Sequence, residues 1–528
     1  MVSQDRANAI LHPTDLVRRL QPDSPSLHFQ NIFKSDHAFR QIPVWDARHL
    51  PPDSDGSRSR PLVRFRAMIQ DTSPSPEVYL HHTGWGIADA EPTSSPINYD
   101  NLKERIVLWA VNVPGESSWY ADKLDAPDNH CQTRAPQQLQ VSKQHKWPLP
   151  AEPCVVAQIK IYDVAAAEHF KPTDIVTFVG ILASEPENSE FASDALVPTI
   201  HVLFHRHLST DPLAHELSSS PFHPSLRDSL IAWIASEALG NDHDAAEWVL
   251  LSCIAMVWVP SSACFLLRSN FFLNSQSRNP PILPPSLTIS RFPRPPTSDA
   301  APSLTYVLSE LLPRSILVPL SLDLINTINF APESRDEDLH AGILQLAPGT
   351  TVLVTESGIE EGKINEKGVR NLQTLQEAIK LQTLHYVFPY SQFSFPTDLC
   401  FIVATEGKKS AFFETSVNLP LAPGPSAHPN LFKSRSDVVL PPPDTLSAFR
   451  DWIIAAKRGN FTICSDVSQF ITDDFVKDRL ADKSVSPEDL VSQMTVARLM
   501  SLSRHQWELT QETWALAKAL DARRKARD

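Results

Sequence analysis

The first clear pattern in the chain is an alternation of apolar and polar residues over residues 62–70. One face of this stretch carries the apolar side chains Val63, Phe65, Ala67 and Ile69. Arg64 and Arg66 fall on the opposite face. A period of two is typical of a strand with one buried face. We therefore expect the four apolar side chains to be buried and the two arginines to face solvent.

Further strand-like stretches follow, with little helical periodicity between them. They cover residues 105–111, 154–162, 171–182 and 197–208. Several short strands within about 150 residues predict a small β-barrel of the OB kind over residues 60–215. The polar, proline-rich segment 122–153 predicts a disordered insertion in this barrel. Residues 1–59 predict a short helical segment followed by a tether.

The hydrophobic period changes to that of a helix after Ser225. Two helices are expected at 226–239 and 245–257, and further on helices alternate with strands. This alternation predicts an α/β domain over residues 216–444, whose clearest strand is 350–356. Its other expected elements are a proline-rich connection at 280–302, a helix at 304–312, a strand at 316–319, a helix at 372–381, strands at 384–388 and 399–405, and a polar tether at 423–443.

The last part of the chain, residues 445–528, has helical periodicity. Ser486 offers a capping hydroxyl, Pro487 takes the first helical position, and two carboxylates follow, so we expect a helix to about residue 502. A final helix at 511–524 places its buried face at Trp514, Ala517 and Leu520. The expected fold class is an α/β multidomain protein: an OB-like barrel, an α/β domain and a C-terminal helical region.

Residues 248–267 carry no charge, and their length is close to that of a membrane span. Pro260 and two serines interrupt the stretch. A buried core helix over residues 248–259, lying beside the 350–355 strand, is the interpretation we favour. A membrane span and a locally wrong gene model are the alternatives.

Composition narrows the function classes. The chain has 528 residues, 14 Gly, 46 Pro and a formal net charge of -14. Such a charge argues against wrapping nucleic acid, because phosphate neutralisation needs concentrated Lys and Arg. The six cysteines form no C-x-x-C pair, so neither a zinc knuckle nor a disulfide framework is indicated, and a reducing compartment fits. The N-terminus has no apolar signal-peptide core.

Candidate catalytic motifs are missing or incomplete. No glycine opens a G-x-x-x-x-G-K-[ST] phosphate-binding loop, and Gly362-Lys363 and Gly407-Lys408 lack the hydroxyl and the spaced glycine that it needs. Gly115-Glu-Ser117 is not a G-x-S-x-G nucleophile elbow. We therefore predict no catalytic, cofactor-binding or metal-binding residues, no cofactor and no enzymatic activity.

Three weaker signals stay open. His201, His205 and His207 could share one face of a strand and hold zinc, although surface or edge-strand histidines fit better. Arg64 and Arg66 beside Phe65 could bind single-stranded nucleic acid, as OB-folds do. The basic run 523–527 is either an import signal or the cationic end of a helix.

Specific strings carry a resemblance. One is the run Val113, Pro114, Gly115, Glu116, Ser117, Ser118 and Trp119; others lie at 62–71, 196–202, 342–346 and 473–476. Together they resemble the mini-chromosome maintenance complex-binding protein family, or MCM-binding protein family. The resemblance runs from about residue 60 to 525 and is interrupted at residues 258–277, where a gene-model error is suspected.

The stretch 350–408 is also similar to an MCM ATPase core of the AAA+ type that has lost its catalytic groups. In that comparison residues 351–356 occupy the Walker B strand, with Thr355 where the metal-binding aspartate would be and only Glu356 retained. Residues 376–383 resemble the helix that leads into the presensor hairpin, and residues 401–405 the sensor strand. The helices from residue 445 to 528 resemble the helical lid.

The resemblance implies a nuclear, non-catalytic protein that binds MCM helicase subunits and regulates MCM complex assembly or unloading. It also implies roles in DNA replication and sister-chromatid cohesion, with a weak or indirect chromatin association and no membrane contact. The alternative is a single-stranded nucleic-acid-binding OB-fold protein. A steep loss of DNA affinity with added salt would favour that alternative.

Overall fold

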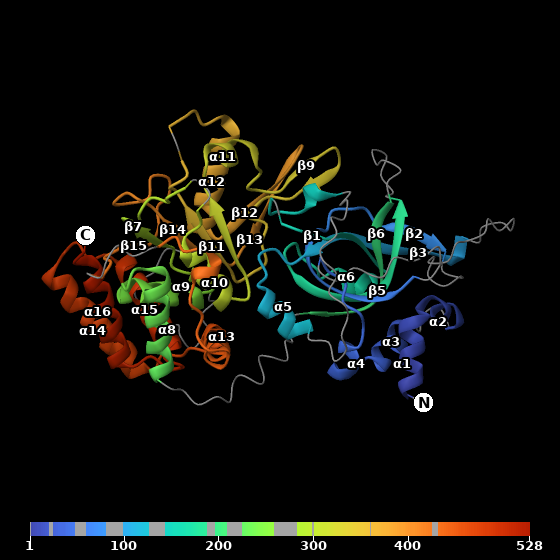
Figure 1. The fold of residues 1–528 in the computed structure, drawn as a ribbon, viewed down its shortest axis with the longest axis horizontal. Coiled ribbons are helices and arrows are strands. Elements are labelled where there is room, and N and C mark those ends of the chain that lie inside the picture. The colour runs from blue at the N-terminus through green and yellow to red at the C-terminus, as the bar shows by residue number, and fades with distance from the viewer. Residues whose placement is uncertain are drawn as a thin grey trace. The chain divides into compact units, whose positions relative to one another are not determined.

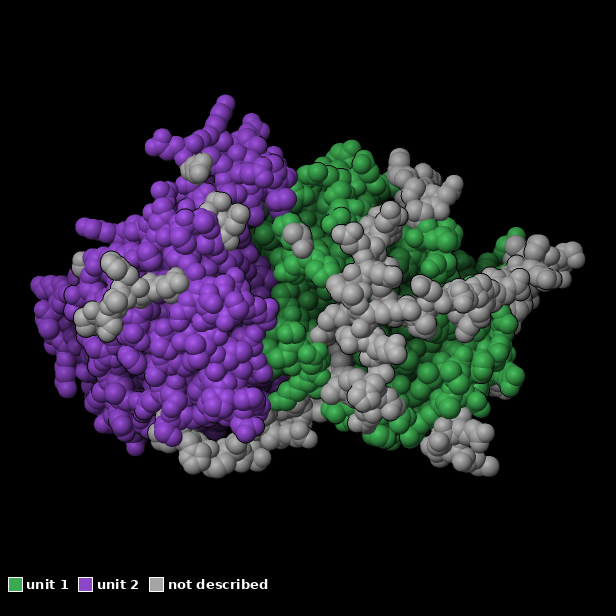
Figure 2. Space-filling view, in the orientation of Figure 1, with its two compact units in different colours: residues 1–211, 329–347, 385–393 green, residues 212–328, 348–384, 394–528 purple. Residues whose placement is uncertain are grey.

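The computed structural model describes residues 2–20, 25–47, 60–80, 99–125, 143–150, 152–186, 196–207, 224–257, 282–297, 300–359, 361–424 and 431–527. The fold is a mixture of helices and strands in several sheets. Contacts divide the chain into two compact units (Figure 2). The first unit comprises residues 1–211, 329–347 and 385–393; the second comprises residues 212–328, 348–384 and 394–528.

The first unit is built on a mainly antiparallel sheet (Figure 1). Its strands are β1 (Leu62–Asp71), β2 (Glu77–Leu80), β3 (Leu102–Asn112), β4 (Val156–Ile161), β5 (Ile175–Pro186) and β6 (Leu196–His207). The order is β1-β5-β6-β4-β3-β2, and β1 also pairs with β3, so five strands form a closed ring of pairings. One pairing in the ring, β4 with β6, is parallel. Closure leaves few exposed sheet edges.

The expected inner face of β1 is confirmed. Val63, Phe65, Ala67 and Ile69 are all at most 2% exposed. The expectation that the two arginines face solvent is wrong, because Arg64 is 3% exposed and only 9% of the Arg66 side chain is exposed. The outer face of this sheet is covered by apolar side chains of the N-terminal segment, including Phe29 and Phe33.

That N-terminal segment is more ordered than a helix and a tether. It forms α1 (Val2–Leu11), α2 (Pro13–Arg19), α3 (Pro25–Ile32) and α4 (Asp36–Arg40). The Ser35 hydroxyl caps α4 by accepting a hydrogen bond from the Ala38 amide. Ala9, Val17 and Ala38 join one apolar cluster with Leu62 of β1, so these helices complete the core of the first unit. Residues 48–59, part of the expected tether, lie outside the described residues.

The insertion expected at 122–153 is also partly ordered. The helix α5 (Ser118–Asp125) opens it, residues 126–142 lie outside the described residues, and the one-turn helix η3 (Gln144–Lys146) follows. Lys146 is fully buried, which contradicts a disordered excursion at this position. The short helix α6 (Val164–Ala167) then joins β4 to β5.

The second unit contains an all-parallel five-stranded sheet (Figure 1). Its strands are β7 (Leu287–Ser290), β8 (Ser315–Pro319), β11 (Thr350–Thr355), β14 (Leu399–Ala404) and β15 (Val417–Pro420), in the order β15-β7-β14-β11-β8. Every residue of β11 and β14 is buried, as expected for parallel strands with both faces covered. The strand predicted at 350–356 is confirmed. The sequence did not predict β7, which lies within the expected proline-rich connection.

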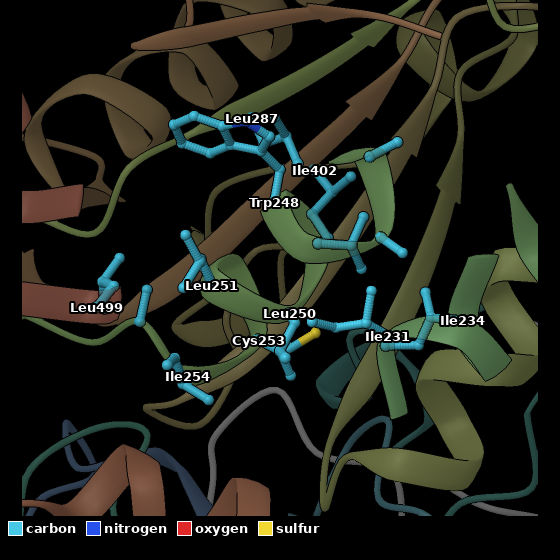
Figure 3. Close-up of a cluster of buried hydrophobic side chains, with 14 of the residues drawn as sticks. Ile231, Ile234, Trp248, Leu250, Leu251, Cys253, Ile254, Leu287, Ile402 and Leu499 are labelled. Carbon is cyan, nitrogen blue, oxygen red and sulfur yellow. The ribbon is translucent and has the colours of Figure 1, made fainter. Parts of the chain in front are cut away.

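Helices pack on this sheet and on one another. They are α8 (Pro224–Ala238), α9 (His243–Ile254), α10 (Ser303–Leu311), α11 (Leu322–Thr327) and α12 (Glu366–Leu381). The helix expected at 248–259 is confirmed as a core helix, but it ends at Ile254 and packs mainly on β7 and β14. Figure 3 shows its side chains between Leu287 of β7, Ile402 of β14 and Leu499 of a later helix. Residues 258–277 lie outside the described residues.

The described part of the chain holds no helix long and apolar enough to cross a membrane.

Four further helices end the chain: α13 (Pro443–Arg458), α14 (Ser465–Ala481), α15 (Pro487–Ser503) and α16 (Gln511–Lys525). The predicted cap of α15 is confirmed, since Ser486 and Asp489 form a reciprocal capping box. The tether expected at 423–443 is partly wrong, because Leu431 and Val438 belong to the core cluster and the turn η7 (Arg435–Asp437) lies between them. Residues 425–430 lie outside the described residues.

A smaller sheet completes the fold. It contains β9 (Glu333–Arg335), β10 (Asp338–His340), β12 (Thr383–Phe388) and β13 (Ser391–Pro396), in the order β10-β9-β12-β13. In the first unit, β9 pairs with β10 in antiparallel fashion and with β12 at Val387 in parallel fashion. This sheet therefore brings residues 329–347 and 385–393 together beside the barrel strands of the same unit.

Candidate functional site

The carboxylate of Glu356 is held by its own unit. Glu356 directly follows β11, and it is 8% exposed, while Thr355 is 6% exposed. One carboxylate oxygen accepts a hydrogen bond from the Ser410 hydroxyl, and the other accepts one from the Ala411 amide at 3.2 Å. Both oxygens are thus engaged by the segment that follows β14. Thr355 and Glu356 lie side by side at the carboxyl end of β11, which is where parallel sheets bind ligands.

A phosphate-binding loop would lie between a strand and the helix after it. In the second unit the corresponding connection runs from β7 to α10 and contains four prolines and no glycine over residues 291–302. The amides of Arg291 and Phe292 donate to the carbonyls of Gly407 and Thr405, at 2.9 and 2.8 Å. These backbone donors are therefore already used within the protein.

The first amide of the helix that follows, α10, is also hydrogen-bonded within the protein. The amide of Ser303, at the start of α10, donates to the Leu431 carbonyl at 2.8 Å. An unoccupied helix N-terminus can bind an anion through its free amides, but this donor is taken. The amides of Arg291, Phe292 and Ser303 are therefore not available to a phosphate.

The motif at residues 113–119 forms a turn after β3. Gly115 has a positive φ of 66°, which a glycine adopts without strain. The Glu116 carboxylate binds Arg66 of β1 through two hydrogen bonds, one of which is 2.6 Å long. The Arg66 guanidinium lies 5.8 Å from the centre of the Tyr120 ring. This bidentate ion pair fixes the turn against the barrel.

The other motif residues support the same turn. Val113 and Pro114 are buried, and the Ser117 carbonyl accepts hydrogen bonds from the Tyr120 and Ala121 amides at the start of α5. Trp119 is half-buried, with its ring edge-on to Tyr120. The motif therefore positions a strand, a turn and a helix relative to one another.

A pocket of about 220 Å³ lies beside this turn, within the first unit. Its walls include Val113, Gly115, Glu116 and Ser118 of the motif, together with Trp45 and Glu152. Partial desolvation raises the pKa of the Glu152 carboxyl, which lies at the exposed rim.

The arginines proposed for nucleic-acid binding are occupied by protein groups. The Arg64 side chain donates to the Ile42 carbonyl at 3.0 Å and lies over the Phe39 ring. Arg66 is paired with Glu116. The sequence pattern could not indicate this, because α4 and the motif turn are remote from β1 along the chain.

The three histidines of β6 do not form a metal site. His201 is fully buried, and its two ring nitrogens lie 2.7 Å from the Tyr162 hydroxyl and 2.7 Å from a Glu185 oxygen. His205 and His207 instead meet each other edge-on beside Phe170. No cluster of metal-ligating side chains occurs within the described residues. The expectation of surface or edge-strand histidines is wrong for His201.

The basic run at the C-terminus pairs with an acidic helix start. Arg527 forms ion pairs with Asp242 at 2.7 Å and Asp244 at 2.8 Å, at the N-terminus of α9. Arg523 also pairs with Asp244, at 2.9 Å. The run therefore anchors the end of the chain to the core helix of the second unit.

A buried charged centre, which the sequence did not predict, joins three segments of the first unit. The Lys146 ammonium lies 3.2 Å from Asp71 of β1 and 2.5 Å from Asp338 of β10. It also lies 5.0 Å from the centre of the Trp109 ring. Burial alone would raise the pKa of Asp338, but hydrogen bonds from His145 and Lys143 and the charge of Lys146 lower it below its usual value.

Neutral groups complete this centre. The Gln345 side-chain amide donates to the Gln70 carbonyl at 2.7 Å and to the Tyr386 hydroxyl at 3.0 Å. Burial raises the pKa of that hydroxyl. The arrangement ties residues 329–347 and 385–393 to β1, and no group in it is placed as a nucleophile or a metal ligand.

The comparisons with known proteins agree over most of the chain. A family model described as "Mini-chromosome maintenance replisome factor" matches residues 122–528. The chain is similar to the mini-chromosome maintenance complex-binding protein of Arabidopsis thaliana, at 26% identity over 94% of this chain and 92% of that protein. It is similar to the protein of that name from Danio rerio at 28% identity, over 95% and 93% of the two chains. The Homo sapiens protein of that name is 25% identical over the same shares.

Proposed function

This chain belongs to the family of mini-chromosome maintenance complex-binding proteins, and we propose that it binds subunits of the MCM helicase. The observation that carries the proposal is the match of the family model over residues 122–528. The relatives, which are named for binding the MCM complex, align with nearly the whole chain.

We propose further that the second unit is an AAA+-like ATPase domain without nucleotide turnover. The all-parallel sheet with β11 in an inner position supports this assignment. Thr355 stands where an aspartate would hold magnesium, and the Glu356 oxygens are occupied by Ser410 and Ala411. The amides of Arg291 and Phe292, directly after β7, are bonded to protein carbonyls, which supports a role in contact rather than catalysis.

In the same proposal the first unit is an OB-like barrel that supports protein contacts. The closed ring of five strands with one parallel pair supports this fold. The engagement of Arg64 and Arg66, together with the net charge of -14, weighs against single-stranded nucleic acid as the main ligand.

Calorimetry with Mg-ATP tests the absence of turnover. We expect no micromolar binding and no release of phosphate by the purified full-length chain. Micromolar binding that disappears in Glu356→Ala would contradict the proposal, because it would locate a working nucleotide site at the end of β11.

Mixing the purified chain with recombinant MCM subunits tests direct binding. A complex that persists from low to moderate salt and in the absence of DNA is expected. Failure to form any complex would contradict the proposed function. Affinity for single-stranded DNA that falls steeply with salt would favour the nucleic-acid alternative.

The cellular roles follow from the same proposal. We propose a nuclear protein that regulates MCM assembly or unloading and thereby supports replication and cohesion. Imaging of the tagged chain tests its location, and exclusion from the nucleus throughout the cell cycle would contradict it.

A further inference from the structure

The hairpin between β12 and β13 is unusually apolar for an exposed segment. No residue from Tyr386 to Thr397 carries a charge, although 20% of the chain is charged. The tip of this hairpin, within residues 385–393, belongs to the first unit. Figure 1 shows β12 and β13 as neighbouring strands, in agreement with the sheet order.

Large side chains of this tip are exposed. Tyr390 is 102% exposed, Phe393 is 54% exposed and Val387 is 37% exposed. The Phe393 ring packs edge-on against Phe388, 5.7 Å between centres, which holds it in place on the surface. Exposed aromatic side chains are enriched where proteins bind other proteins, because a rigid ring buries much area at low entropic cost.

The strand that carries Phe393 is also a sheet edge. β13 ends the order β10-β9-β12-β13 within the described residues. Its residues from Ser391 to Ser394 are all exposed. Edge strands are normally protected from pairing by charged side chains such as lysine. The part of β13 in the first unit, residues 391–393, has none of this protection.

The absence of charge also indicates which kind of partner binds at this edge. A nucleic acid would need cations here, and none occurs between Tyr386 and Thr397. A second copy of this chain would bring together two net charges of -14, which disfavours close association. An extended, uncharged segment of a different protein fits the edge, with main-chain bonds for affinity and apolar side chains for specificity.

We propose that this hairpin tip is a docking edge, on which an extended apolar segment of a partner protein adds as a strand beside Ser391–Phe393. The inference rests on the proposed function, since the partner is a subunit of the MCM complex. The barrel then supplies the rigid support for an exposed recognition strand.

Lysines at the tip test the proposal. In the full-length chain, Tyr390→Lys with Phe393→Lys restores the charge that protects natural edges. Both positions are exposed, so the fold tolerates the change, and the thermal midpoint stays within about 2 °C of the wild type. The matched control is Tyr99→Lys with Leu27→Lys, which adds the same charge at positions 77% and 64% exposed in the same unit.

Binding is measured against recombinant MCM subunits. We expect the tip variant to bind at least about tenfold more weakly, whereas the control keeps wild-type affinity. Hydrogen exchange adds a readout of strand pairing, and the amides of residues 391–393 should gain protection on complex formation.

Each of the other outcomes contradicts a specific part of the proposal. Wild-type affinity of the tip variant, or equal losses in tip variant and control, overturns the docking edge and leaves the proposed function intact. Weaker binding without amide protection overturns strand addition. A further outcome is that the wild type self-associates and that the lysines abolish this self-association but not MCM binding. That result would assign the edge to a second copy of the chain and would overturn the docking of an MCM segment. Failure of the wild type to bind MCM subunits overturns both proposals.

Discussion

Both units have apolar cores, but in the first unit a buried ionic centre also joins segments that are remote in sequence. In the first unit two lysines, Lys146 and Lys160, are at most 2% exposed and are paired with carboxylates. In the second unit the central helix α9 contributes apolar side chains such as Leu250 and Ile254 to a core cluster that also holds Leu287 of β7 and Ile402 of β14 (Figure 3). An ionic centre depends on every partner, whereas an apolar core depends mainly on filled volume.

Geometry explains the contrast. Lys146 joins segments that are remote in sequence, so its ammonium fixes where residues 329–347 lie on the barrel of the same unit. Leu250 has no directional partner. The effects of substitutions on stability should therefore differ between the two centres, both in their physical cause and in their size.

The largest effect is expected for Lys146→Met. The change leaves the Asp71 carboxylate, in a side chain that is 3% exposed, without its buried cation, and should cost about 3–5 kcal/mol of unfolding free energy. Denaturant unfolding measures it. Lys103→Met on the exposed part of β3 is the control and should change stability by less than about 0.5 kcal/mol. Equal stabilities of the two variants would show that the ionic centre does not stabilise the fold.

A somewhat smaller loss is expected for Leu250→Ala in α9. Leu250 is fully buried, and the cavity left by truncation should cost about 2–4 kcal/mol. Leu250→Met keeps the volume and should cost less than about 1.5 kcal/mol. If methionine were as harmful as alanine, shape rather than volume would control this core.

A pH dependence separates the two units further. The pKa of Asp338 is lower in the folded chain than in the unfolded chain, so its contribution is present above the ordinary aspartate pKa of about 4 and is lost as the pH falls through the folded value. Asp338→Asn should cost about 1–3 kcal/mol at pH 7. The difference from the wild type should shrink on acidification below about pH 4. A difference independent of pH would contradict the assigned charge.

The smallest effect is expected for Glu356→Gln. Glutamine keeps one acceptor oxygen for Ser410 or Ala411, so the loss should be about 1 kcal/mol. MCM binding should not change, because Glu356 is buried and is proposed to have no catalytic role. A large loss of MCM affinity at unchanged stability would show that the end of β11 is part of the binding site.

The sequence predicted elements whose signals are local. The cap at Ser486, the strand at 350–356 and the inner face of β1 depend on neighbours in the chain, and all three are confirmed. The four-residue strand β7 was missed because it is too short to show a period among prolines. The docking hairpin had a local signal, the charge-free run from Tyr386 to Thr397, but its exposure needed the structure.

Features made by distant segments could not be predicted. The burial of Arg64 depends on helices that precede β1, and the Lys146 centre depends on Asp71 and Asp338. The pairing of Arg66 with Glu116 likewise joins the middle of β1 to the turn after β3, which no periodicity relates. These contacts decide which charges are available to a ligand, so the nucleic-acid hypothesis for β1 could be judged only after folding.

Affinity purification of the tagged full-length chain from its native cells tests the central claim most directly. We expect MCM subunits to be recovered in near-stoichiometric amount and the complex to survive nuclease treatment. Recovery without MCM subunits, or loss of the complex after nuclease, would contradict direct binding to the MCM helicase.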